Sequence, residues 1–311
     1  MSNRIKIKAK FGVRGEIRAI LRNLDGSIIS DTGWTPNLFT DLGLGNMVDG
    51  GNWGPYWCLG SGSTPPQASD VNMSAFIKNI TDSTGQISPV KTNSGAPDYI
   101  LTETWSKRWS EGPGESGVVA EFGKCQDTLG NGTDIHTLVN PPINKNDDQV
   151  LDFYHRMTAT PDLTETTGQV TITDQSGTPQ LYNYTAKFAN IDSAQANISS
   201  SWIEFTSFGG HTLYDGNFGA TITDIPSGAS DIATENPIKI SSGVGVRQYQ
   251  VEFGVDSSNF PTGIRSGYSR WNTLANAGIQ WEISRASDGA ALIKTDDQKV
   301  LVDMVIEVVA L

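Results

Sequence analysis

The sequence is poor in the residues that build metal centres and disulfide frameworks. Its 311 residues include two cysteines and three histidines. The histidines are scattered, and none pairs with a cysteine or a glutamate at the spacing of metal ligands, so we expect no structural zinc and no bound metal. Cys58 and Cys125 cannot make a disulfide framework. The sequence leaves open whether they pair, and buried, reduced thiols are the default expectation.

Long apolar runs and nucleotide-binding motifs are also missing. No run approaches the roughly 18 residues that cross a membrane, and no apolar segment follows the basic start, so we expect neither membrane insertion nor a secretory signal. There is no Walker loop, Rossmann glycine fingerprint, Gly-x-Ser-x-Gly elbow or His-Glu-x-x-His pair. We therefore expect no cofactor and no enzymatic activity, although 34 carboxylates leave a chance glycosidase dyad open.

Charge is distributed unevenly along the chain. The net charge is −12, yet residues 1–22 hold seven basic side chains and one acid, which leaves −18 for the remainder. A basic segment on an acidic body predicts docking onto an acidic neighbouring protein. The alternative is that alternating lysines form only the solvated face of a strand. Nucleic acid is not expected as a partner, because the acidic body would repel a duplex. The predicted docking residues are Arg4, Lys6, Lys8, Lys10, Arg14 and Arg18.

Alternation with a period of two dominates the sequence and predicts β-strands. In residues 4–11 the odd positions are apolar and the even positions basic, which predicts a strand with one buried face. A second strand is expected over 16–23, followed by an Asp25-Gly26 turn. The clearest strand is the last, over 300–308. We predict a mainly β protein of two antiparallel β-sandwich-like domains, 1–160 and 161–311.

One or two short helices are expected in the N-terminal third. The better candidate lies around residues 36–48, where Thr35 can cap the helix and Pro36 suits its first position. A second short helix is predicted around residues 70–80. The rest of the chain is expected to form strands separated by Gly-, Asn- and Pro-containing turns.

Two further groups of residues suggest binding sites. Trp53, Tyr56 and Trp57 lie within five residues and could stack on sugar rings if exposed, or form a buried aromatic plug that packs the helix onto the sheet. Residues 127–134 place oxygen-bearing side chains on a Gly-rich loop, which could hold calcium or form an ordinary hairpin. His155 shares a strand face with Phe153 and is expected in the core.

Four short segments occur in an order that resembles a known family. They comprise a Gly-Trp/Asn-Leu start, a Gly-x-Gly-Ser/Thr loop followed by proline, an x-Glu-x-Gly strand, and a Pro-Pro-Ile turn before a strand ending in an aromatic. This order resembles a group of tailed-bacteriophage virion structural proteins of tail, fibre or collar type, and residues 278–308 are similar to the second half of such proteins. The segments are DTGWTPNLFTDLGLGNM (31–47), WCLGSGSTPP (57–66), GVVAEFG (117–123) and LVNPPINKNDDQVLDFYHRMT (138–158).

The resemblance implies a structural role in a virion. It leads us to expect a tail, neck, collar or fibre component, made in the host cytoplasm, that forms a cyclic homo-oligomer and docks to other virion proteins. The family offers no catalytic residues to transfer. The alternative is a carbohydrate- or receptor-binding module at a fibre tip, which would bind a host-surface glycan through Trp53, Tyr56 and Trp57.

Overall fold

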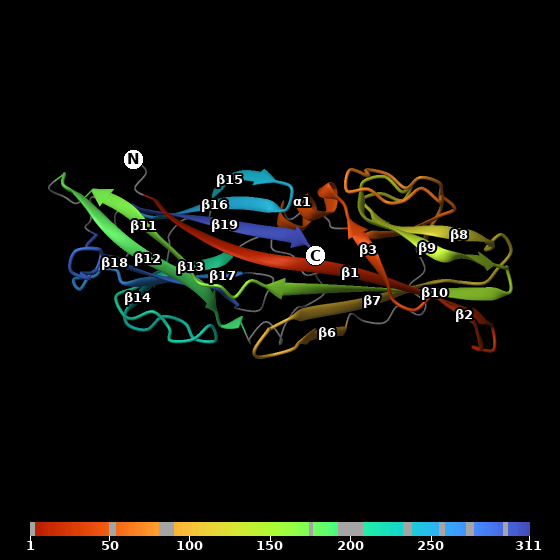
Figure 1. Cartoon of the computed structure of the whole chain (residues 1–311), viewed down its shortest axis with the longest axis horizontal. Helices are drawn as coiled ribbons and strands as arrows, with labels where there is room; N and C mark the ends of the chain where they lie inside the picture. Colours follow the sequence, from red (N-terminus) through yellow and green to blue (C-terminus); the bar gives the residue numbers. More distant parts are fainter. Residues whose placement is uncertain are drawn as a thin grey trace. The chain divides into compact units, whose positions relative to one another are not determined.

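The computed structural model of the chain is dominated by β-strands. It describes residues 4–49, 54–80, 90–173, 177–191, 208–232, 238–254, 259–271, 277–294 and 298–311. Within these ranges it contains strands β1 to β19 and one helix, α1 (Asp41–Asp49) (Figure 1). No helix in the described part of the chain is long and apolar enough to cross a membrane. The predicted mainly β class is therefore confirmed.

The strands group into two compact units. Unit 1 comprises Met1–Phe11, Asn93–Tyr99 and Pro161–Glu307, and unit 2 comprises Gly12–Thr92, Ile100–Thr160 and Val308–Leu311. The chain passes from one unit to the other inside β1 (Arg4–Asn23) and again inside β19 (Val300–Ala310). The single domain division after residue 160 stays a prediction.

Unit 1 contains a six-stranded antiparallel sheet in the order β11-β12-β18-β17-β13-β14. A separate ladder joins β15, β16 and β19. Phe11 of β1 contacts Phe188 and Trp271 of the six-stranded sheet edge-on, with ring centroids 5.3 and 5.6 Å apart, so an aromatic core lies between them. The bounds are β11 (Thr166–Thr173), β12 (Pro179–Ala189), β13 (Phe208–Tyr214), β14 (Ser230–Ile232), β15 (Ile238–Gly243), β16 (Val246–Phe253), β17 (Ser266–Trp271) and β18 (Gly278–Arg285).

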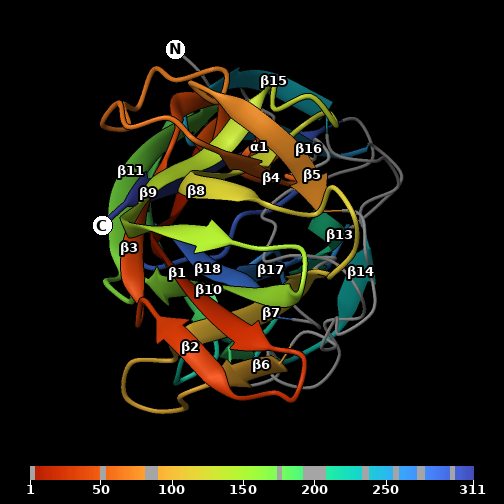
Figure 2. The same ribbon diagram turned by 90° about the vertical axis from the view of Figure 1, so that its right-hand side faces the viewer.

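Unit 2 contains the ladder β3-β9-β8-β4-β5, and a second pair in which β10 lies beside β7 (Figure 2). Phe122 of β8 stacks on Phe153 of β10 with centroids 5.5 Å apart, which joins the two groups of strands. The bounds are β2 (Ile28–Asp31), β3 (Thr35–Phe39), β4 (Tyr56–Gly60), β5 (Phe76–Ile80), β6 (Val90–Asn93), β7 (Leu101–Trp109), β8 (Gly117–Cys125), β9 (Thr133–Lys145) and β10 (Gln149–Pro161).

The first strand is longer than predicted. The expected strands over 4–11 and 16–23 form one 20-residue strand, β1. Burial at odd positions continues without a break, because Val13 and Ile17 are as buried as Ile5 and Ile7. The turn after β1 is confirmed, with Gly26 at φ 87° between Asn23 and Ser27. The last predicted strand is also confirmed as β19, whose even positions from 300 to 308 are buried.

Both helix predictions need correction. Residues predicted to open the first helix form β3, which pairs with β1 on one side and β9 on the other. The helix cap is Thr40 instead of Thr35, since the Gly43 amide donates to Thr40 Oγ1 at 3.0 Å. The second helix, around 70–80, is wrong because Phe76–Ile80 forms β5 and pairs with β4. Sheet pairing of the backbone outweighs the local helix signals at both places.

The predicted Pro-Pro-Ile turn is part of β9. Pro141 and Pro142 lie where the pairing of β8 with β9 changes register, between the pairs Glu121↔Leu138 and Val119↔Ile143. Proline lacks an amide proton and is tolerated at such a break in the ladder. The turn before β10 instead lies just after β9, where the Gln149 amide donates to the Asn146 carbonyl at 3.1 Å.

Candidate functional site

The predicted docking residues lie on an integral strand. β1 pairs with β2, β3, β10 and β19, so the basic segment is part of the sheet and not a projecting arm. Lys6 and Lys8 are exposed and Lys10 is half-buried. The side chain of Arg4 lies outside the described residues. The described side chains of this segment thus lie on a face of β1 that is exposed or half-buried, and docking onto a neighbouring protein stays a prediction.

Three of these basic side chains form ion pairs with acidic residues of the same chain. Arg18 Nε donates to Asp31 Oδ1 at 2.9 Å, and this guanidinium holds the pKa of Asp31 at about 2. Such local pairing accounts for part of the sequence's charge asymmetry without any partner protein. The pairs are Lys8–Glu307, Arg14–Glu16 and Arg18–Asp31.

Of the predicted sugar-stacking trio, the structure describes Tyr56 and Trp57, and neither forms an exposed platform. Trp57 is 1% exposed, and its ring meets Phe122 edge-on with centroids 5.5 Å apart. Tyr56 is half-buried, and Trp53 lies outside the described residues. The stacking prediction is wrong for Trp57. Its ring packs into the core of unit 2, because burying a large aromatic ring is more favourable than leaving it in water.

A second aromatic contact places Trp57 beside buried ionisable groups. His155 lies 6.4 Å from the Trp57 ring, and Lys124 Nζ lies 5.8 Å from it. Burial lowers the pKa of Lys124 well below its ordinary value, although Glu103 and Asp134 oppose this shift. Burial also lowers the pKa of His155 well below its ordinary value, which fits the predicted core position.

The two cysteines and the Gly-rich loop are the remaining candidates from the sequence. Cys58 and Cys125 are free, buried thiols in one cluster with Met73. In the Gly-rich loop, both carboxylate oxygens of Asp127 accept hydrogen bonds from the loop itself, including the Asn131 amide at 2.9 Å. This loop closes the β8–β9 hairpin, as the simpler interpretation predicts. No group of three or more acidic, histidine or cysteine side chains suited to a metal occurs among the described residues.

The sequence prediction missed a buried polar network centred on Glu121. Glu121 lies on β8 and is fully buried. One of its oxygens accepts the Ala75 amide at 2.7 Å, and the other accepts the Ser74 hydroxyl at 2.7 Å and amide at 3.2 Å. His136 of β9 lies 3.0 Å from the same oxygen through Nε2, and 2.8 Å from Asp70 through Nδ1. The network therefore ties the loop between β4 and β5 to β8 and β9.

The geometry favours one protonation state for this network. Both ring nitrogens of His136 lie within hydrogen-bond distance of carboxylate oxygens, which favours the imidazolium, the form in which both nitrogens donate. Burial lowers the pKa of His136, but hydrogen bonds to Glu121 and Asp70 outweigh it and the pKa is raised. Burial likewise raises the pKa of Glu121, but hydrogen bonds from His136, Ser74 and Ala75 bring it down to about 2.

Glycines make room for the Glu121 carboxylate. A Cβ at Gly60 would lie 2.1 Å from Glu121 Oε1, and one at Gly62 would lie 1.8 Å from Ser74 Oγ. The Gly-x-Gly loop and the x-Glu-x-Gly strand of the family resemblance thus meet at this network. Ser74 donates to a carboxylate that is ionised and already shared with His136, so the arrangement does not activate a nucleophile. The hydrogen bonds of this network hold the loop between β4 and β5 in place.

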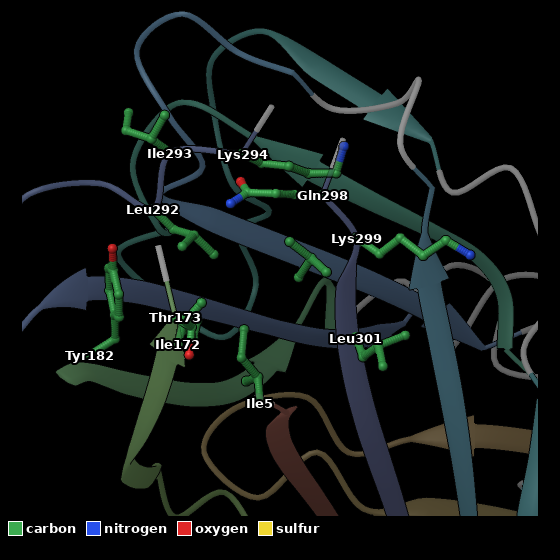
Figure 3. A pocket seen from close by; sticks show the side chains of 11 residues that line it. Ile5, Ile172, Thr173, Tyr182, Leu292, Ile293, Lys294, Gln298, Lys299 and Leu301 are labelled. Atoms are coloured by element: carbon green, nitrogen blue, oxygen red, sulfur yellow. The ribbon is translucent and has the colours of Figure 1, made fainter. Parts of the chain in front are cut away.

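A small cavity lined by both polar and apolar side chains lies in unit 1 (Figure 3). Ile5, Tyr182 and Leu292 line it together with Lys294, whose ammonium donates to Asn259 Oδ1 at 2.7 Å. Its volume of about 180 Å³ is below the ~300–1,000 Å³ of typical small-molecule sites, so we assign it no ligand.

Among the described strands, β2 in unit 2 and β15 in unit 1 are edge strands that each expose two apolar side chains. In the β1–β2 hairpin, Leu24, Ile28 and Ile29 are 61%, 55% and 44% exposed, and every residue of β2 is exposed. In the β15–β16 hairpin, Ile238 and Ile240 are 57% and 44% exposed. An exposed apolar edge presents unpaired backbone groups beside an apolar surface, which suits pairing with another chain.

The β1–β2 hairpin is also held firmly. Asp25 Oδ1 accepts the Ser27 amide at 2.8 Å, and the Asn23 amide donates to the Ser27 carbonyl at 3.0 Å. The hairpin is therefore a preformed surface, which limits the ordering cost of an interface.

Comparison of the chain with protein-family models, with curated proteins and with solved structures found no match.

Proposed function

We propose that the chain is a structural protein of a tailed-bacteriophage virion, a tail, neck, collar or fibre component that assembles as a homo-oligomer. The observation that carries this proposal is the pair of exposed apolar edge strands, β2 and β15. The ordered family-like segments support it, because two of them meet at the Glu121 network. The neighbouring virion proteins remain the proposed docking partners.

Assembly through these edges has a physical basis. Exposed strand edges pair readily with other chains unless charge, proline or a covering element blocks them. Burying Leu24 and Ile28 against a second copy would remove apolar surface from water, which is favourable. A closed ring of copies would leave no open edge, and cyclic oligomers achieve this closure.

The first prediction concerns assembly. We expect the purified chain to form a homo-oligomer in size-exclusion chromatography with light scattering. Leu24→Asp combined with Ile28→Asp should shift the mass toward the monomer, because the two side chains are 61% and 55% exposed and contribute little to the monomer core. Val71→Asp is the matched control, at a 58% exposed loop position. Unchanged mass in the double variant would remove β2 from the interface, and a monomeric wild type would refute the homo-oligomer.

The second prediction concerns docking through the basic face of β1. Lys8→Glu should reduce incorporation into particles and cost at most about 1 kcal/mol of stability, because the Lys8–Glu307 pair is partly exposed. Adding Glu307→Lys restores the ion pair with reversed charges. If Lys8 docks on an acidic neighbour, incorporation stays low in the double variant. Recovery of incorporation, measured by mass spectrometry of particles, would assign Lys8 to the internal pair alone.

Receptor binding at a fibre tip remains the second proposed function. It cannot use Trp57 as a stacking surface, because that ring is buried. It would need an open surface elsewhere in the chain.

A further inference from the structure

An open cleft in unit 1 lies beside the loop that connects β13 and β14. Asn190 follows β12 at one side of the cleft, and Asn217, Phe218, Thr223 and Asp224 line it from the loop. The cleft has a volume of about 530 Å³, within the ~300–1,000 Å³ that ligand sites occupy. It is distinct from every site that the sequence predicts.

The loop is held from beneath by one buried side chain. Gln280 of β18 is fully buried, and its Oε1 accepts the Gly219 amide at 2.9 Å. Its Nε2 donates to the Thr221 carbonyl at 2.8 Å and to the Asp224 carbonyl at 3.3 Å. One amide group thus fixes three points of a loop that has no regular secondary structure of its own.

Further hydrogen bonds close the base of the loop. The Ser227 amide donates to the Asn217 carbonyl at 3.0 Å. The Ala229 amide donates to Asp215 Oδ1 at 2.8 Å, and Thr262 donates to the other oxygen of Asp215 at 2.9 Å. A loop fixed in this way presents its side chains in one arrangement, which lowers the ordering cost of binding.

The lining combines planar polar groups with apolar surface. Asn217 is exposed and Phe218 is half-buried, with Lys187 Nζ 4.2 Å from the ring centroid. Lys187 also donates to the Ala220 carbonyl at 3.0 Å, which fixes the ring from one side. Ile225 is 47% exposed. The cleft therefore offers amide, carboxylate and hydroxyl groups next to an aromatic ring.

This chemistry fits one class of ligand best. Among the described residues, the lining includes a carboxylate and no basic side chain, which disfavours phosphates and other anions. Two hydrogen bonds from Thr221 lower the pKa of Asp224, so this carboxylate is ionised at neutral pH. The amides and the carboxylate exclude a purely apolar ligand, because its burial would leave them without partners.

We propose that this cleft binds a neutral saccharide. Asn217 and Asp224 would hydrogen-bond ring hydroxyls, since amides and carboxylates present two adjacent atoms to vicinal hydroxyl groups. Phe218 and Ile225 would contact the apolar C–H face of the sugar. Gln280 is a positioning residue that holds the loop. The inference is independent of homo-oligomeric assembly and gives the receptor-binding alternative a defined surface.

The test uses the full chain on an array of bacterial surface glycans, followed by titration of the best-bound neutral glycan. We expect binding with Kd raised about tenfold by Asn217→Ala, which removes a side chain with one or two hydrogen bonds to the sugar. Phe218→Leu should weaken binding to a similar degree, because it keeps apolar volume and removes the ring. Asn144→Ala, at an exposed position of β9 in unit 2, should leave Kd unchanged.

The outcomes separate this inference from the proposed assembly. Asn217→Ala should leave the light-scattering mass and the circular dichroism spectrum unchanged, because Asn217 is exposed. Lack of binding to any neutral glycan would overturn the inference, as would binding that survives both Asn217→Ala and Phe218→Leu. Preferred binding of anionic glycans would also overturn it. None of these results bears on whether the chain forms a homo-oligomer.

Discussion

Replacing Glu121 with leucine is expected to lower the free energy of unfolding by about 3–5 kcal/mol, the usual cost of breaking a buried ionic network by removing one partner. The carboxylate accepts hydrogen bonds from His136, Ser74 and Ala75 in a fully buried position. Leucine would leave these donors without an acceptor, and the imidazolium of His136 would lose one of its two counter-charges. Urea unfolding followed by circular dichroism measures the change.

Two control variants separate charge from packing. Glu121→Gln keeps the shape and one acceptor oxygen, so we expect a smaller loss than for leucine. Glu282→Leu removes a carboxylate from an exposed position of β18 and should change stability by no more than about 0.5 kcal/mol. If Glu121→Leu and Glu282→Leu behave alike, the network does not hold the loop between β4 and β5.

The same network predicts how stability depends on pH. The pKa of His136 is raised, so its contribution is complete below its ordinary value of 6.5 and is lost as the pH rises through the raised value. The pKa of Glu121 is lowered from 4.5 to about 2, so its contribution is complete above 4.5 and is lost as the pH falls toward 2. We expect the network to stabilise the fold most between pH 4.5 and 6.5.

The Glu121→Gln variant tests this pH dependence. A glutamine cannot titrate, so the difference in unfolding free energy between wild type and variant should shrink as the pH falls below 4.5. It should also shrink as the pH rises through the raised pKa of His136, because neutral histidine cannot donate to both carboxylates. A difference that stays constant across this range would show that Glu121 is not coupled to the network.

Alternation in the sequence predicts strands well but not their partners. The buried positions of β1 and β19 follow directly from residues such as Ile5, Val13 and Met304. Period two identifies which face of a strand is buried, yet it does not say which strand lies alongside. The helix predicted around residues 36–48 begins later, at Asp41, for this reason, since residues 35–39 form β3 and pair with β1 and β9.

The sequence contains a sign of the Glu121 network, but local patterns do not identify the residues that contact Glu121. Glu121 is the one charged residue in the apolar segment GVVAEFG. A charge in such a segment requires a buried partner, and its partners Ser74 and His136 lie 47 and 15 residues away in sequence. The charge asymmetry near the N-terminus is also visible in the sequence. The acidic partners of Arg18 and Lys8 are not, because these ion pairs form only when the strands pair.

Replacing Trp57 with alanine is expected to cost about 3–5 kcal/mol, the range for truncating a buried tryptophan. The ring is 1% exposed and contacts Phe122 and His155 at centroid distances of 5.5 and 6.4 Å. Removing it would open a cavity between β4, β8 and β10. It would also remove the ring that Lys124 Nζ faces at 5.8 Å. Trp57→Phe should cost less, because a smaller ring keeps part of these contacts.

This variant also decides between a buried plug and a sugar platform at the aromatic cluster. If Trp57 packs unit 2, Trp57→Ala lowers the urea midpoint, and any loss of glycan binding follows the loss of folded protein. A surface platform would instead lose binding at an unchanged midpoint, because exposed substitutions rarely change stability by more than about 0.5 kcal/mol. Measuring the midpoint and glycan affinity on the same samples separates the two, and we expect the first result because Phe122 and Lys124 enclose the ring.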